Sequence, residues 1–117
     1  MDEYKFRVVH MGINGGTKEE ADKIAKVFNA LFGFESRVTA ISTFASNEIE
    51  VMNSDGPGTK GHIAIGTPDL PKAMAYLETK GITFRKESAK YLEDGTLWLI
   101  YADDEIGGFA WHLVKAQ

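Results

Sequence analysis

The sequence predicts an α+β fold built from two tandem β-α-β-β-β modules whose curved sheets form a cup. The chain has 117 residues, of which 44% are hydrophobic and 26% charged, and this is the material of one ordinary globular domain, residues 1–117. The order of an apolar strand, an amphipathic helix and further short apolar segments occurs twice. All three histidines and one glutamate stand at matching places in the two halves: His10, Glu50, His62 and His112.

The first module is expected over residues 5–53. A strand of about residues 5–13 ends at Asn14-Gly15-Gly16, which is a strong turn signal. Thr17 with Glu20 three positions later forms a capping-box pattern, which starts a helix. Apolar residues recur along this helix at helical spacing and predict one buried stripe: Ala21, Ile24, Ala25, Val27, Phe28, Leu31 and Phe32.

The rest of the first module is expected to be three short strands. Gly33 supplies the C-terminal stop of the helix. Segments rich in Val, Ile, Thr and Phe follow between about 34 and 53, with Asn47 as a turn residue. The Gly-rich and Pro-containing stretch at 53–58 is the predicted boundary between the modules.

The second module is expected over residues 61–115 and repeats the same order. A strand at about 61–66 leads to Asp69, which can cap a helix that ends at Gly81. Three further strands are predicted, near 83–91, 96–102 and 108–115.

Composition and charge restrict the class of function. The net charge of -4 and the dispersed lysines and arginines argue against a nucleic-acid partner. The first residues do not resemble a signal peptide, and no apolar run approaches the roughly 18 residues of a membrane span. The absence of cysteine excludes disulfides and thiolate ligands. We therefore expect a soluble cytoplasmic protein that acts on a small molecule and has no membrane partner.

Strand alternation predicts what lies beside the first histidine of each module. Side chains two residues apart share a face, so His10 and His62 should lie beside mostly small residues: Val8, Gly12, Ala64 and Gly66. Small neighbours would leave an open cavity next to the imidazoles, as in a ligand-bearing cup.

Three imidazoles and a carboxylate form a candidate metal site. A single strand histidine is more often structural, but three at positions related by the repeat favour metal binding. This donor set suits Zn, Ni, Fe(II), Mn or Co and does not choose among these divalent ions. Two of the histidines with Glu50 would also form the triad of non-haem iron enzymes. Glu48 is an alternative to Glu50, because it is predicted on the same strand face.

The chain resembles the vicinal oxygen chelate superfamily, which includes glyoxalase I, extradiol dioxygenases, methylmalonyl-CoA epimerase and bleomycin resistance proteins. The resemblance covers nearly the whole chain and is carried by the repeat and by several stretches of the second half: Gly61-His62-Ile63-Ala64-Ile65-Gly66, Asp69-Leu70, Ala73, Tyr76-Leu77-Glu78, Lys80-Gly81-Ile82 and Phe84.

The resemblance implies a glyoxalase-like metal-dependent lyase, isomerase or epimerase, or a dioxygenase. The lyase, isomerase or epimerase would act on a small oxygen-rich metabolite through a metal-stabilised enolate. The family's four metal positions fall on His10, Glu50, His62 and His112. Glyoxalase I-like enzymes usually carry a glutamate base where this chain has His112. The resemblance leaves open whether His112 is a ligand or a base, and makes Glu50 the better candidate for the catalytic base as well as a ligand.

Two other functions and a dimer are also expected from the resemblance. One alternative is a non-catalytic protein of the same fold that binds a small molecule or an antibiotic. The other is an accessory domain of sugar-acid metabolism, since the segment 106–114 is similar to small domains found alone or fused to 2-keto-3-deoxy-6-phosphogluconate aldolases. Edge strands on both modules predict a homodimer.

Two arginines that follow the helix ends are also candidates for substrate contact. Arg37 and Arg85 occupy similar places in the two halves. A solvated surface is the simpler interpretation of both, and contact with an anionic substrate is the alternative.

Overall fold

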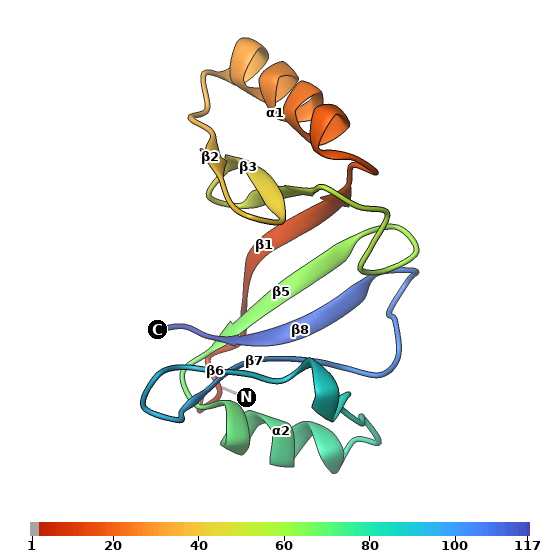
Figure 1. The fold of residues 1–117 in the computed structure, drawn as a ribbon. Helices are drawn as coiled ribbons and strands as arrows, with labels where there is room; N and C mark the ends of the chain where they lie inside the picture. The colour runs from red at the N-terminus through yellow and green to blue at the C-terminus, as the bar shows by residue number, and fades with distance from the viewer. Residues whose placement is uncertain (1–2) are drawn as a thin grey trace.

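The computed structural model describes residues 3–117 and confirms the α+β fold. One eight-stranded mixed sheet carries two helices (Figure 1). The first module contains β1 Arg7–Asn14, α1 Lys18–Phe32, β2 Arg37–Val38, β3 Ser42–Ser46 and β4 Ile49–Met52. The second module contains β5 His62–Thr67, α2 Leu70–Glu78, β6 Lys90–Tyr91, β7 Leu97–Tyr101 and β8 Ala110–Lys115.

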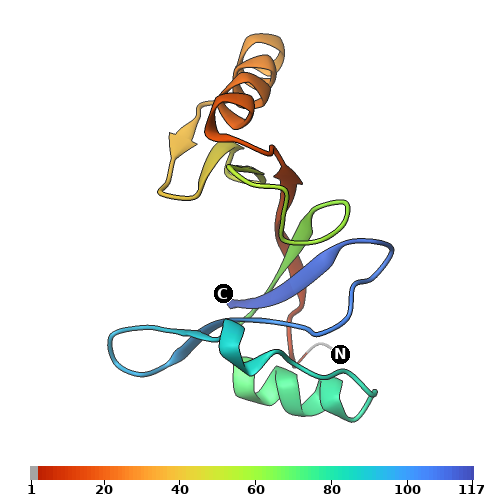
Figure 2. The ribbon, with the colours of Figure 1, turned by 45° about the vertical axis from the view of Figure 1, so that its right-hand side comes forward.

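The two modules meet at the centre of the sheet. The strand order is β2-β3-β4-β1-β5-β8-β7-β6, so β1 and β5 are neighbours and pair antiparallel. Each of these strands pairs in parallel with the last strand of its own module, β4 or β8. The helices consequently lie at opposite ends of a molecule that extends 43 Å along its longest axis (Figure 2). The sheet edges are β2 and β6, which have only two residues each.

Helix α1 begins and ends where the sequence predicts. The side chain of Thr17 accepts a hydrogen bond from the backbone N–H of Glu20, which satisfies a free donor of the first turn. Gly33 ends the helix in the left-handed region at φ 73°, where glycine is unstrained. Ala21 and Ala25 are buried, and the helix packs on β3 and β4.

Helix α2 packs on the second half of the sheet. Asp69 caps it by accepting a hydrogen bond from the backbone N–H of Lys72. The helix ends at Glu78, and Gly81 follows in the left-handed region two residues after the cap. The buried cluster beneath the helix is formed by Leu70, Ala73, Phe84, Ile100, Ala102, Trp111 and Leu113.

The strand predicted at 83–91 is wrong over most of its length. A 3-10 turn at Lys86–Ser88 replaces it, and only the two residues of β6 and a single bridge at Phe84 pair with the sheet. Ser88 explains the difference: its backbone N–H and its hydroxyl both donate to the Arg85 carbonyl, and its hydroxyl accepts from the Tyr101 N–H. Serine thus offers the backbone a local alternative to the strand ladder.

A β-bulge in β1 corrects the predicted face of Val8. The register of β1 on β5 shifts between Val8 and His10, so Val8 pairs with Ile65 and His10 pairs with Ala64. Cross-strand partners point to the same side of a sheet, and Ile65 and Ala64 point to opposite sides. Val8 therefore leaves the face of His10, because the bulge inserts one extra residue.

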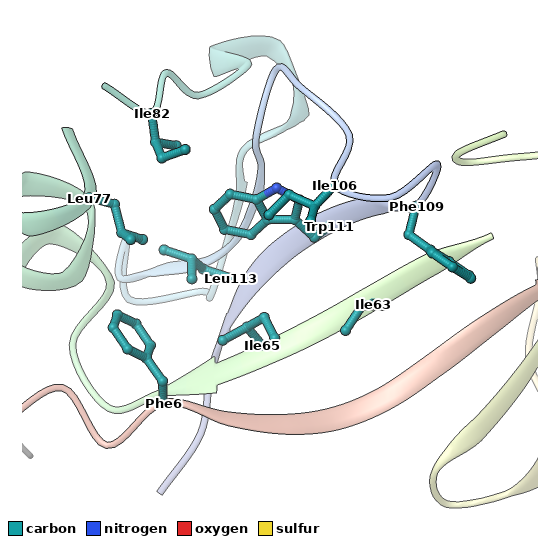
Figure 3. A pocket seen from close by; sticks show the side chains of 9 residues that line it. All are labelled: Phe6, Ile63, Ile65, Leu77, Ile82, Ile106, Phe109, Trp111 and Leu113. Atoms are coloured by element: carbon teal, nitrogen blue, oxygen red, sulfur yellow. The ribbon is translucent and has the colours of Figure 1, made fainter. Parts of the chain in front are cut away.

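The helix-bearing face of the sheet holds an apolar cavity of about 300 Å³. Figure 3 shows Ile63 and Ile65 of β5, Trp111 and Leu113 of β8 and Leu77 of α2 around it. All nine described residues that line it are hydrophobic, so they offer no side chain for acid-base or metal chemistry. Among the described residues no helix is long and apolar enough to span a membrane.

Candidate metal centre

The four predicted ligand residues converge on the opposite face because of the strand register. One row of paired residues crosses the sheet as Phe44, Glu50, Gly12 and His62. The next row runs through four further residues: His10, Ala64, His112 and Tyr101. Side chains in such rows point to one side, so the ligand candidates lie on adjacent rows of the same face.

The donor atoms lie close to one another. Nε2 of His10 and Nε2 of His62 lie 3.2 and 3.1 Å from Oε1 of Glu50. Imidazole nitrogens of His10, His62 and His112 all lie within 4.8 Å of one another. His62 and His112 are 1% and 2% exposed, and Glu50 is buried with them. The structure therefore brings together all four residues that the sequence singled out.

Glu50 is held as a carboxylate. Its Oε2 accepts a hydrogen bond of 2.7 Å from the Ser42 hydroxyl, and its Oε1 faces the two imidazoles. Burial by itself raises the pKa of Glu50, but the contacts with His10, His62 and Ser42 outweigh it and hold the pKa well below its usual range. A carboxylate with a lowered pKa is a poor proton acceptor, so these contacts favour the ligand role of Glu50 over its predicted role as base.

His112 is held as a neutral imidazole. Burial, together with the neighbouring imidazoles of His62 and His10, lowers the pKa of His112 to about 4, against the raising effects of the Leu113 carbonyl and of Glu50. Nδ1 lies 3.2 Å from this carbonyl. When Nδ1 donates to the carbonyl, Nε2 carries the free lone pair, which is the tautomer a metal ligand needs.

The space beside His62 is filled and not open as predicted. Gly12 pairs with His62 across the β1–β5 ladder, and a Cβ atom on Gly12 would overlap the His62 ring. The absence of a side chain at Gly12 therefore serves to admit the imidazole. The open space lies above the histidines instead, in a cavity of about 500 Å³.

The cavity is lined by apolar residues and by a few polar groups that sequence reasoning missed. Tyr101 lines the histidine side of the cavity. Ser42 is fully buried and reaches the site through its hydrogen bond to the Glu50 carboxylate. The Tyr101 ring centroid lies 4.8 Å from that of His112. Burial, with the nearby charge of Glu50, raises the pKa of Tyr101 to about 12, so it remains a protonated hydrogen-bond donor. The sequence alone does not show that Tyr101 lies beside His112, because this contact depends on the pairing of β7 with β8.

The alternative carboxylate, Glu48, lies outside the cup. It is exposed in the turn before β4 and lines a separate cleft with Glu35. Among the described residues that line the cup, Glu50 is the only acid.

The arrangement fits a divalent metal ion on three counts. Nε2 of His10 is buried and forms no hydrogen bond with any described residue, although it lies 3.2 Å from Oε1 of Glu50. Nitrogen and oxygen ligands lie about 2.1 Å from such ions, so adjacent ligands are about 3.0–3.4 Å apart, as the contacts to Oε1 are. Finally, Ser42 and the Leu113 carbonyl occupy the outer positions that orient ligating groups.

Comparison with solved structures identifies the fold. Methylmalonyl-CoA epimerase of Streptomyces coelicolor, solved as a variant with 2-nitronate-propionyl-CoA, superimposes with a TM-score of 0.64 at 18% identity, covering 92% of this chain and 95% of that one. The chain has the glyoxalase-like fold. Methylmalonyl-CoA epimerase of Mycobacterium tuberculosis gives a TM-score of 0.63 at 15% identity, covering 94% of this chain and 87% of that one.

A protein without a described activity shares this fold as well. A hypothetical protein of Bacillus halodurans superimposes with a TM-score of 0.65 at 11% identity, covering 96% of this chain and 95% of that one. No protein-family model and no curated protein matches the sequence. The similarity therefore fixes the glyoxalase-like fold and leaves the reaction to be inferred from the site.

Proposed function

We propose that the chain is a metal-dependent epimerase or isomerase that acts on a small oxygen-rich metabolite. The observation that carries the proposal is the convergence of three imidazoles and one ionised carboxylate at the floor of a 500 Å³ cavity. Solved structures of the same fold include a methylmalonyl-CoA epimerase in complex with methylmalonyl-CoA. Lyase and dioxygenase activities rest on the family resemblance alone and remain predictions.

In this proposal His10, Glu50, His62 and His112 hold one divalent ion of the group Zn, Ni, Fe, Mn and Co. A bound ion would supply Lewis-acid stabilisation of negative charge on substrate oxygens. Ser42 would keep the Glu50 carboxylate aimed at the ion, and the Leu113 carbonyl would fix the tautomer of His112. Tyr101 would donate a hydrogen bond to a substrate oxygen, because it stays protonated at neutral pH.

A non-catalytic binding protein is the second candidate, and one observation favours it. Proton transfer at carbon needs a base, and the described lining of the cup contains no carboxylate besides Glu50. Glu50 has a lowered pKa and would be engaged with the ion. Metal-dependent capture of a small molecule needs no base. The accessory role in sugar-acid metabolism and the homodimer also remain predictions.

Two measurements test the proposal in order. Titration of chelator-treated protein with Zn, Ni, Mn or Co is expected to give one ion per chain, and Glu50→Gln is expected to weaken binding by more than about a hundredfold, since loss of an outer-sphere partner alone costs about 10–100-fold. Glu48→Gln is the matched control, because Glu48 is exposed outside the cup. A protein that binds no ion, or equal loss in both variants, would contradict the metal site.

Exchange of a carbon-bound proton separates enzyme from binding protein. The metal-loaded protein is incubated in D₂O with methylmalonyl-CoA and with 2-oxo acids, and deuterium entering the carbon next to the carbonyl is followed by NMR. Exchange that depends on the ion and is lost in His62→Ala supports the isomerase. Tight binding without exchange would favour the binding protein.

A further inference from the structure

Two cations stand on opposite rims of the cup. Arg37 comes from β2 and Lys90 from β6, the two edge strands of the sheet, and both line the cavity that holds the histidines. They stand at opposite edges of one concave face, so a molecule resting on the histidines would have a positive group on either side.

Arg37 is directed toward the histidines by its place in the ladder. It pairs with Phe44, which pairs with Glu50, so all three side chains share the face of the cup. The guanidinium carbon lies 4.2 Å from the centroid of the Phe44 ring, and that ring meets the His10 ring edge to face at 5.5 Å. The guanidinium is thus stacked one ring away from the proposed ligands, with its N–H edge left for a partner.

Neither cation is neutralised by the part of the chain that the structure describes. Among the described residues, no carboxylate lies within ion-pair distance of Arg37 or Lys90. Glu35 and Glu48 line a separate cleft with Arg37 without reaching its guanidinium. Arg85, which the repeat pairs with Arg37, does not line the cup.

The charge of the cup consequently favours anions. Its only described acid, Glu50, is occupied by two imidazoles and the Ser42 hydroxyl. A divalent ion on the histidines would make the cavity still more positive. A cleft with one sign of charge and apolar walls concentrates ligands of the opposite sign. The apolar walls here are Ile41, Phe44, Met52, Trp98, Leu99 and Val114.

We propose that the substrate carries an anionic group, a carboxylate or a phosphate, at the end remote from the oxygens that face the histidines, and that Arg37 binds this group. Lys90 would add attraction from the opposite rim. The inference rests on the proposed metal-chelating function and adds the substrate class to it. Arg37 is a specificity residue here, since its planar guanidinium can bind a carboxylate or phosphate through two hydrogen bonds.

Matched ligands test the proposal by isothermal titration of the Mn-loaded protein. 2-Oxoglutarate and 2-oxopentanoate share a chelating 2-oxo acid head, and only the first carries a distal carboxylate. 2-Oxo-4-phosphonobutanoate places a phosphonate at the same end. We expect one of the two dianions to bind about tenfold more tightly than 2-oxopentanoate, as a charge-assisted pair would provide. The preferred dianion identifies carboxylate or phosphate as the group recognised.

Variants assign the preference to a residue. Arg37→Gln is expected to reduce binding of the dianions to the level of 2-oxopentanoate while leaving 2-oxopentanoate unchanged. Arg37→Lys should keep part of the preference, and Lys90→Gln should reduce it about twofold, as a rim charge does. Arg85→Gln is the matched control and should change nothing, because Arg85 is exposed and outside the cup.

The possible failures are distinguishable. If all three ligands bind the Mn-loaded protein equally, or if Arg37→Gln weakens all three alike, the inference about Arg37 is overturned while metal chelation stands. If no ligand binds although Mn is bound, substrate chelation fails and the inference falls with it. If Mn itself does not bind, the proposed metal site is wrong.

Discussion

In the first module Gly12 of β1 pairs with Glu50 of β4, and in the second module Ala64 of β5 pairs with His112 of β8. In each first strand the histidine stands two residues before the small residue: His10 before Gly12, and His62 before Ala64. Across the centre of the sheet, His10 faces Ala64 and His62 faces Gly12. The backbone of the two modules is thus related by an approximate two-fold, while the side chains at matching positions differ in charge and size.

The difference shows that the two modules contribute different chemical groups to the same site. The first module supplies the negative charge, because Ser42 and two imidazoles keep Glu50 ionised. The second module supplies a neutral imidazole and a protonated phenol, because burial lowers the pKa of His112 and raises that of Tyr101. The repeat fixes where the ligands stand, and the environment of each module fixes their protonation.

The largest expected effect comes from replacing Gly12 with alanine, the residue that stands at the matching position 64 of the second module. In Gly12→Ala the new methyl group would overlap the His62 ring, so the buried ring would have to leave its position beside Glu50. We expect a loss of about 1–3 kcal/mol in the free energy of unfolding from overpacking and loss of stoichiometric metal. Chemical denaturation and metal titration measure both.

The reverse change in the second module is the control for this prediction. Ala64→Gly removes a methyl group at the matching position and should cost only about 0.5–1 kcal/mol, with the metal retained. If Gly12→Ala binds metal as the parent does, His62 is not confined by β1 and the proposed pairing of glycine and imidazole is wrong.

The next effect is a pH dependence that distinguishes His112 from the rest. Its pKa is 6.5 in the unfolded chain and about 4 when folded. Between these values the unfolded chain binds a proton that the folded chain does not, so stability is complete above pH 6.5 and falls as the pH drops toward 4. The loss is on the order of 2–3 kcal/mol.

Below pH 4.5 the lowered pKa of Glu50 adds a further loss in the same direction. Urea unfolding of the chelator-treated protein between pH 7 and pH 4 measures the slope, and His112→Gln should flatten the part above pH 4.5. An unchanged slope in that variant would show that other groups carry the dependence.

The sequence predicts the elements and the ligand candidates because they depend on local signals. Thr17, Gly33 and Asp69 mark helix ends through their own caps, and the repeat aligns the four ligand residues. Two of the predictions that failed depend on contacts between segments that are far apart in the sequence. The bulge at Val8 and the approach of His62 to Gly12 arise from the contact between β1 and β5. The strand predicted near 83–91 was lost to the Ser88 hydrogen bonds.

The smallest expected effect is that of Tyr101→Phe, and it emerges from a comparison of one hydroxyl from each module. Ser42→Ala removes a buried hydrogen bond of 2.7 Å to the Glu50 carboxylate. We expect a cost of about 1–3 kcal/mol in the metal-free protein and a metal affinity about 10–100-fold weaker. Tyr101→Phe removes a hydroxyl that forms no hydrogen bond among residues 3–117, and should change the free energy of unfolding by less than about 0.5 kcal/mol.

Denaturation and metal titration of the two variants under the same conditions decide whether support of the carboxylate is confined to the first module. Equal losses in Ser42→Ala and Tyr101→Phe would mean that the phenol also holds the ligands. An effect of Tyr101→Phe on ligand binding alone, with unchanged metal affinity, would instead place this hydroxyl against the substrate. That outcome would sharpen the division of roles: the first module orients the charged ligand, and the second contacts the bound molecule.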